Sequence, residues 1–163
     1  MIDAETRALS IRVLDACRAR KWMVATAESC TGGLVAGALT EIAGSSDVVD
    51  RGFITYSNAA KMAMLGVPDE TLRRHGAVSR QTALAMASGA LARADVHLTM
   101  AITGVAGPGG GTVEKPVGLV YFAAATRDGG LVHREKRYGD IGRSEVRRLS
   151  VIEALSMLFE LAR

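Results

Sequence analysis

The sequence has few of the residues that metal sites, disulfide frameworks and base-stacking surfaces need. It contains two cysteines, Cys17 and Cys30, and three histidines, and none of them stands at metal-ligand spacing. A reducing compartment argues against a bridge between the two cysteines. Aromatic residues make up 4% of the chain, too few for the stacking platform of single-stranded nucleic-acid binders. We therefore expect no metal and do not favour nucleic acid as a partner.

Long apolar runs are also missing. No run approaches the ~20 residues that a bilayer span needs, so no membrane association is expected. The first five residues include two acidic ones and lack the basic region and apolar block of a signal peptide, which predicts the cytoplasm. With 163 residues, 48% of them hydrophobic, we expect one globular domain over 1–163. The net charge of +3 is compatible with a small anionic ligand.

What the sequence does contain is a regular alternation of helical and strand patterns. Apolar spacing predicts helices over about 3–20, 34–43, 59–64, 68–75, 79–93 and 143–162. Continuous or alternating apolar runs predict strands over about 22–25, 48–56, 96–103, 117–126 and 131–138. Residues 127–130 are a hairpin signal, so part of the sheet is antiparallel. The predicted fold is α/β, a single-domain three-layer α/β/α sandwich with a mixed, partly antiparallel sheet.

The stretch 26–33 joins the first predicted strand to the second helix. Its small and polar residues are Glu28, Ser29, Cys30, Thr31, Gly32 and Gly33. The start of a helix leaves backbone N–H groups unpaired, and a hydroxyl or thiol beside such donors suits acyl transfer. The alternative is an ordinary helix N-cap by Ser29 or Thr31, with glycines for packing.

A serine nucleophile needs a base, and no histidine lies in a promising loop. Lys61, in the apolar run 59–64, is the candidate because burial would lower its pKa from ~10.4 towards neutrality. The alternative is an exposed helix lysine. Tyr56, at the end of the preceding strand, is expected to orient Lys61 or the nucleophile, or else to be a half-buried strand tyrosine.

A second grouping uses Glu28, Lys61 and Cys30 as a carboxylate–lysine–thiol set. A thiolate becomes a strong nucleophile once a helix N-terminus lowers its pKa. Sequence spacing does not choose between Cys30 and Ser29, and both remain open at this point.

A second glycine-rich loop spans 104–111. It could cradle a phosphate or a planar ring with its backbone, but it lacks the Lys-Ser/Thr ending of a P-loop. A flexible surface loop is the alternative. The candidate phosphate partners are Lys115, Arg143, Arg147 and Arg148.

Taken together, an ordered series of motifs resembles the CinA C-terminal domain family, which includes stand-alone nicotinamide-nucleotide amidases. The motifs are AESCTGG at 27–33, AGSS at 43–46, RGFITYSN at 51–58 with Lys61 after it, LGV at 65–67, HGAVS at 75–79, GVAGP at 104–108 and KPVG at 115–118. The resemblance covers about 26–140, most of the chain.

The resemblance implies a hydrolase without metal or cofactor. Its substrate would be a small-molecule pyridine nucleotide: nicotinamide mononucleotide and water would give nicotinic acid mononucleotide and ammonia. The family's serine, lysine and tyrosine map onto Ser29, Lys61 and Tyr56. The family's arginine after the Gly-Asp pair maps onto Arg143, although residues 141–142 lie between.

The expected mechanism starts with neutral Lys61 taking the proton of Ser29, which attacks the carboxamide carbon. Backbone N–H groups around Thr31 to Gly33 would hold the oxyanion. The expected substrate-binding residues are Glu28, Cys30, Thr31, Gly32, Gly33, Thr103, Gly104, Gly107 and Arg143. The rival hypothesis is a non-catalytic nucleotide-binding module of a DNA-uptake or repair system. Small-residue helices permit a homo-oligomer, which we also expect.

Overall fold

A five-stranded mixed sheet forms the centre of the computed structural model, which describes residues 2–163. The strands are β1 (Val24–Glu28), β2 (Val49–Ile54), β3 (Leu98–Gly104), β4 (Leu119–Thr126) and β5 (Leu131–Arg137), in the order β2-β1-β3-β4-β5. β1 pairs in parallel with β2 and β3, whereas β3, β4 and β5 are antiparallel. The predicted mixed sheet is confirmed.

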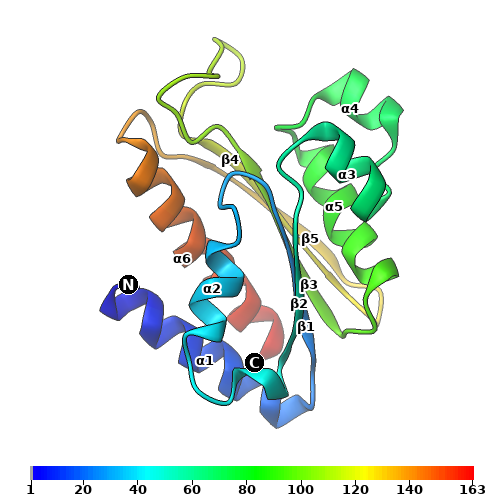
Figure 1. Cartoon of the computed structure of the whole chain (residues 1–163), viewed down its shortest axis with the longest axis vertical. Helices are drawn as coiled ribbons and strands as arrows, with labels where there is room; N and C mark the ends of the chain where they lie inside the picture. Colours follow the sequence, from blue (N-terminus) through cyan, green and yellow to red (C-terminus); the bar gives the residue numbers. More distant parts are fainter. Residues whose placement is uncertain (1) are drawn as a thin grey trace.

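Helices cover both faces of this sheet. They are α1 (Ala4–Arg20), α2 (Leu34–Thr40), α3 (Asn58–Leu65), α4 (Asp69–His75), α5 (Arg80–Arg93) and α6 (Arg143–Ala162), with a 3₁₀ turn, η1, at Ser45–Asp47. Figure 1 shows the sheet nearly edge-on, with α1, α2 and α6 on one side and α3, α4 and α5 on the other. The three-layer α/β/α architecture is therefore as predicted. No helix among residues 2–163 is long and apolar enough to cross a bilayer.

Helix starts follow local capping signals in the sequence. The side chains of Asp3, Ser57 and Ser79 accept hydrogen bonds from backbone N–H groups in the first turns of α1, α3 and α5. Gly66 ends α3 with a φ of 65°, a conformation that glycine adopts without a steric cost. Such caps depend on neighbouring residues only, which is why the sequence predicted these boundaries closely.

The first two strands differ from their predicted form. β1 begins at Val24 and runs on to Glu28 rather than ending near 25, because its pairing with β3 continues to that residue. Glu28 is therefore a strand residue. Ile54, the last residue of β2, is 52% exposed because β2 is an edge strand. Tyr56, two residues beyond β2, is 61% exposed rather than half-buried. β2 contains a bulge at Asp50, since Val24 pairs with Val49 and Ala25 with Arg51.

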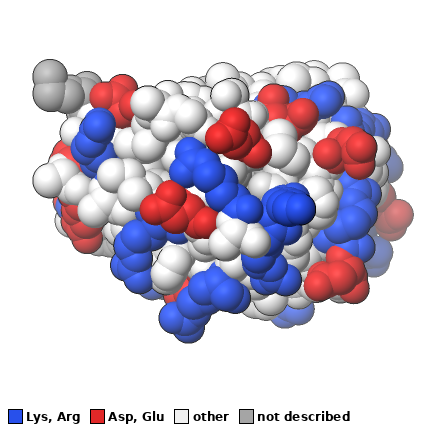
Figure 2. Space-filling view, turned by 90° about the horizontal axis from the view of Figure 1, so that it is seen from below, with Lys and Arg blue, Asp and Glu red and all other residues white. Residues whose placement is uncertain are grey.

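The face at the amino ends of the parallel strands carries charges of both signs. Figure 2, viewed from that end, shows lysines and arginines interspersed with acidic residues. Arg18 illustrates the pattern, since it forms ion pairs with Asp15 and Asp47. A surface of this kind has no extended field of one sign.

Small residues let α5 approach its neighbours closely. The core on this side of the sheet is rich in alanine, including Ala83, Ala87 and Ala90. At Gly89 an added Cβ would lie 2.0 Å from the carbonyl oxygen of Leu65, the last residue of α3. The backbones of α3 and α5 are therefore in direct contact, and this contact fixes α3 on the molecule.

We predict that Gly89→Ala lowers the free energy of unfolding by about 1–3 kcal/mol, because the methyl group forces α3 and α5 apart. The matched control is Gly37→Ala in α2, where an added Cβ meets nothing within 4 Å. That variant should gain about 0.5–1 kcal/mol from helix propensity. Urea unfolding of both variants checks the pair, and equal shifts of the same sign would contradict the close contact.

Candidate active site

A cleft of about 270 Å³ opens at the carboxyl ends of the parallel strands, where open α/β sheets commonly bind ligands. Four segments and the start of α6 surround it: the turn after β1, the segment after β2 with α3, residues 77–78 before α5, and the loop after β3. The lining residues are Ser29, Cys30, Tyr56, Lys61, Ala77, Val78, Thr103, Gly104, Val105, Ala106, Gly107, Gly109, Gly110 and Arg143.

Ser29 and Lys61 meet in this cleft. The Lys61 Nζ atom lies 3.0 Å from the Ser29 Oγ atom, and Lys61 is 0% exposed. Nζ also lies 2.8 Å from the carbonyl oxygen of Thr55 and 3.5 Å from that of Tyr56. The expected exposed-lysine alternative is therefore wrong, because α3 turns Lys61 inward against the end of β2.

The surroundings of Lys61 favour its neutral form. Burial lowers the pKa of the Lys61 amine, and the smaller opposing effect of the Cys30 thiol group raises it. The neutral amine has two N–H groups and one lone pair. In that form the carbonyls of Thr55 and Tyr56 can accept the two N–H groups, and the lone pair is then free to accept the proton of the Ser29 hydroxyl. This is the geometry of a general base beside a nucleophile.

Cys30 lines the same cleft, but its thiol is held protonated. Burial is the main cause that raises the pKa of Cys30 to about 12, and the Glu28 carboxylate raises it further. The N-terminus of α2 was expected to lower the pKa of the Cys30 thiol, but the Glu28 carboxylate occupies that position instead. The geometry therefore favours Ser29 over Cys30 as the nucleophile.

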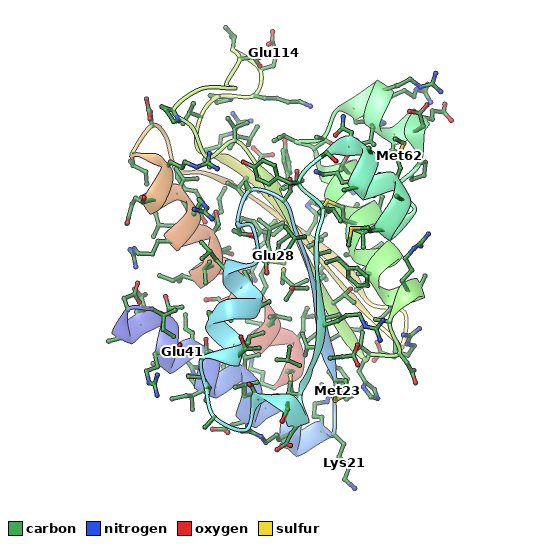
Figure 3. The ribbon with its side chains drawn as sticks, viewed as in Figure 1. Lys21, Met23, Glu28, Glu41, Met62 and Glu114 are labelled. Atoms are coloured by element: carbon green, nitrogen blue, oxygen red, sulfur yellow. The ribbon has the colours of Figure 1, made fainter. Side chains whose placement is uncertain are left out.

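Glu28 caps helix α2 from the end of β1. Its carboxylate accepts hydrogen bonds from the N–H groups of Gly33, Val35 and Ala36 at 3.1, 3.1 and 2.9 Å. Figure 3 shows Glu28 at the start of α2, between this helix and the sheet. The buried charge is balanced by these donors and by the helix dipole. Because Glu28 supplies the cap, the Ser29 side chain is not needed for it and faces the cleft.

The N–H groups of the turn after β1 are not all available to a substrate. Gly32 donates to the carbonyl of Ser29 at 3.0 Å and Gly33 donates to Glu28. Within residues 2–163, no other residue accepts a hydrogen bond from the N–H of Cys30 or Thr31. Oxyanion donors were expected at Thr31 to Gly33, but the N–H groups that remain available lie on Cys30 and Thr31.

Arg143 and Tyr56 form the rim of the cleft. Arg143 donates to the Tyr56 hydroxyl and to the carbonyl of Gly107, both at 2.9 Å. The Tyr56 hydroxyl thus contacts Arg143, while its backbone carbonyl contacts Lys61. Thr103 donates to the carbonyl of Ala77 at 2.7 Å and joins the opposite wall to the sheet.

The predicted site residues divide into two groups. The structure brings Ser29, Cys30, Tyr56, Lys61, Thr103, Gly104, Gly107 and Arg143 into the cleft. Glu28, Thr31, Gly32 and Gly33 do not line the cleft. Sequence reasoning missed the Thr55 carbonyl and the wall at 77–78, since these contribute backbone rather than chemically distinctive side chains.

These features define an α/β/α protein with a buried serine–lysine pair at the carboxyl edge of its sheet. The family model of the CinA C-terminal domain matches residues 6–162. The chain belongs to the CinA C-terminal domain family.

The nicotinamide-nucleotide amidohydrolase PncC of Escherichia coli K12 is 51% identical over 161 residues, covering 98% of this chain and 96% of that protein. The crystal structure of competence/damage inducible protein CihA from Agrobacterium tumefaciens is 57% identical, covers 100% of this chain and 99% of its own, and superposes with a TM-score of 0.98. A CinA-like protein of Synechococcus sp. RCC307 is 51% identical over 95% of this chain, which spans only 37% of that relative.

We predict that Glu28→Gln lowers the free energy of unfolding by roughly 2–3 kcal/mol, since the amide retains one acceptor and turns its own N–H groups towards α2. The control is Glu41→Gln, just beyond the end of α2, where a half-exposed carboxylate lies 3.7 Å from Arg7. It should change stability by less than about 0.5 kcal/mol. Unchanged stability in Glu28→Gln would argue against the capping role.

The buried amine predicts a pH-dependent stability difference between wild type and Lys61→Met. Burial lowers the pKa of Lys61 in the folded protein below its usual 10.5. Between the folded-state pKa and 10.5, the unfolded chain therefore binds one more proton than the folded chain. Wild-type stability should therefore rise with pH relative to Lys61→Met, by up to about 1.4 kcal/mol per pH unit, and level off above 10.5. Urea unfolding at several pH values tests this, and a constant difference from pH 7 to 10 would contradict a neutral Lys61.

Proposed function

We propose that this chain is an amidase that hydrolyses nicotinamide mononucleotide to nicotinic acid mononucleotide and ammonia through Ser29 and Lys61. The observation that carries the proposal is a completely buried Lys61 amine 3.0 Å from the Ser29 hydroxyl in an open cleft. The name of the E. coli relative, which is 51% identical over nearly the whole chain, supports the choice of substrate.

In the proposed first step, Ser29 Oγ attacks the carboxamide carbon while its proton moves to Lys61 Nζ. The carbonyls of Thr55 and Tyr56 keep the amine oriented during the transfer. They also stabilise the ammonium that forms, because it then donates to both carbonyls and to the substrate. No carboxylate is needed to hold the base.

The oxyanion would be held by the N–H groups of Cys30 and Thr31. The N–H of the residue after the nucleophile serves this purpose in other hydrolases with a strand–turn–helix nucleophile. A donor of this type is worth roughly 3–4 kcal/mol of transition-state stabilisation. Protonated Lys61 then passes its proton to the departing amide nitrogen, which leaves as ammonia. The neutral Lys61 that results accepts a proton from water, which hydrolyses the acyl-enzyme.

The nucleotide would lie along the wall formed by Thr103 and the glycine-rich loop 104–111. Close backbone packing explains the glycine at 104, where an added Cβ would lie 2.8 Å from the carbonyl oxygen of Leu119. Arg143 at the rim is exposed, and among residues 2–163 its hydrogen-bond partners are uncharged, the Tyr56 hydroxyl and the Gly107 carbonyl. Its planar guanidinium would bind the 5′-phosphate through two parallel hydrogen bonds.

A non-catalytic nucleotide-binding module explains the site less well. Burying the Lys61 amine without a carboxylate costs free energy, and nucleotide binding alone gives no reason to place it against Ser29. The proposal also includes a cytoplasmic location, since the substrate would be a phosphorylated intracellular metabolite. A homo-oligomeric state remains a prediction from the small-residue helices.

The purified protein is predicted to release ammonia from nicotinamide mononucleotide, with kcat/KM rising with pH as Lys61 loses its proton. Ser29→Ala should lower kcat by at least about 10⁴-fold because the acyl-enzyme no longer forms. Cys30→Ala is the matched control and should retain most of the activity. An enzyme assay for ammonia over a panel of pyridine nucleotides checks both. Retained turnover in Ser29→Ala, or its loss only in Cys30→Ala, would refute the serine mechanism.

A further inference from the structure

Two of the three arginines of helix α6, Arg143 and Arg147, lie one turn apart, and the second is directed away from the cleft's rim. Arg143 contacts Tyr56 and Gly107. Arg147 is half-buried and reaches the turn after β1 instead, where its Nε donates to the carbonyl of Cys30 at 3.1 Å and its Nη2 to the carbonyl of Thr31 at 3.2 Å.

The partners of Arg147 are neutral backbone groups. Within residues 2–163, no carboxylate lies within ion-pair distance of this guanidinium, whereas the neighbouring Arg148 pairs with Asp3, Glu5 and Glu145. An arginine that serves only as a surface charge would be expected to pair as Arg148 does. The contacts of Arg147 therefore point to control of the backbone that follows Ser29.

Fixing a carbonyl also fixes the direction of the next N–H group. In a trans peptide the C=O and the following N–H point in opposite directions. The hydrogen bond from Arg147 to the carbonyl of Cys30 thus directs the Thr31 N–H away from the guanidinium. It is one of the two N–H groups in the turn that donate no hydrogen bond to another residue within 2–163.

Two further features tie the guanidinium to this turn. An added Cβ at Gly32 would lie 3.4 Å from Arg147 Nη2, so the turn and the side chain are in contact. Gly32 has a φ of 59°, which allows the sharp reversal after Thr31. An arginine can hold two successive carbonyls because its donors form a rigid planar fork, whereas a lysine ammonium is a single point.

We propose that Arg147 is a positioning residue that fixes the Cys30–Thr31 peptide so that its N–H stabilises the oxyanion formed at Ser29. The inference rests on the proposed hydrolytic function of this site. Arg147 holds the turn from behind and does not touch the substrate, so it is not a phosphate ligand. Hydrogen bonding to the carbonyl also polarises the peptide group and strengthens its N–H as a donor.

The test compares Arg147→Ala with Arg148→Ala, its neighbour on the same helix. Arg147→Ala should lower kcat by roughly 100-fold, the effect of a small misplacement of catalytic groups, with KM nearly unchanged. Arg148→Ala should keep wild-type kinetics. Low concentrations of guanidinium chloride should partly restore kcat in Arg147→Ala by filling the vacated position. A purely stabilising role predicts the opposite response, because guanidinium denatures proteins.

A second measurement does not depend on the natural substrate. A fluorophosphonate probe forms a bond between Ser29 Oγ and phosphorus, expels fluoride and leaves the serine proton on Lys61, and its phosphoryl oxygen needs the same N–H donors. Labelling of Arg147→Ala should be roughly 100-fold slower than wild type. If wild type is labelled but releases no ammonia from nicotinamide mononucleotide, the proposed substrate fails while the role of Arg147 is still tested.

Two outcomes overturn the inference. One is labelling of Arg147→Ala at the wild-type rate, and the other is a loss of kcat that guanidinium does not restore. If Arg147→Ala does not fold, Arg147→Lys replaces it, since an ammonium can hold one of the two carbonyls. Arg147→Lys should then show a kcat and a labelling rate between those of wild type and a 100-fold loss, with KM unchanged. Wild-type values for both would overturn the inference equally.

Discussion

The contact between the Lys61 amine and the Ser29 hydroxyl is the interaction on which the site depends. An amine buried without a carboxylate is unfavourable when charged, and here burial lowers its pKa. The fold tolerates it because the chain leaves β2 at this point and exposes the carbonyls of Thr55 and Tyr56, two acceptors that match the two N–H groups of a neutral amine. The end of an edge strand thus supplies the acceptors that keep the base buried and oriented.

A second constraint separates the tasks of two neighbouring residues. A serine just before a helix would ordinarily cap it, and a capping hydroxyl is committed to backbone N–H groups. Here Glu28 accepts three N–H groups of α2 from the end of β1, five to eight residues away along the chain. Ser29 is left with Lys61 as its side-chain partner. The same carboxylate raises the pKa of Cys30, which keeps the thiol protonated.

The sequence predicted those features that depend on neighbouring residues. The helices predicted over 59–64 and 79–93, the hairpin at 127–130 and the central strand β3 all follow local patterns, and they are present in the structure. The task of Glu28 was not predictable, because strand β1 extends to it through pairing with the distant strands β2 and β3. The exposure of Ile54 follows from the strand order of the sheet, which no local pattern contains.

Long-range contacts explain the remaining differences. Lys61 is buried because α3 is held against α5, where Gly89 permits backbone contact with Leu65. The hydrogen bond from Arg147 to Cys30 joins residues 117 apart in the sequence, which no local pattern reveals. From the sequence, the positive charge of Arg147 indicated only a candidate phosphate ligand. Composition and spacing identify which residues carry chemistry, whereas the direction of each side chain is decided by packing between distant segments.

Helix α6 connects these packing relations to the chemistry. Its apolar side, including Val146, Leu155 and Leu158, lies in the core shared with α1 and the sheet, so the helix is held as a rigid element. From its first two turns, Arg143 holds the loop after β3 and the segment after β2, while the next arginine along the same face holds the turn after β1. Since one helix contacts all three segments, a small displacement of α6 would move the cleft walls together. The relative placement of the proposed nucleophile, base and phosphate site is therefore set by a packed helix rather than by the loops themselves.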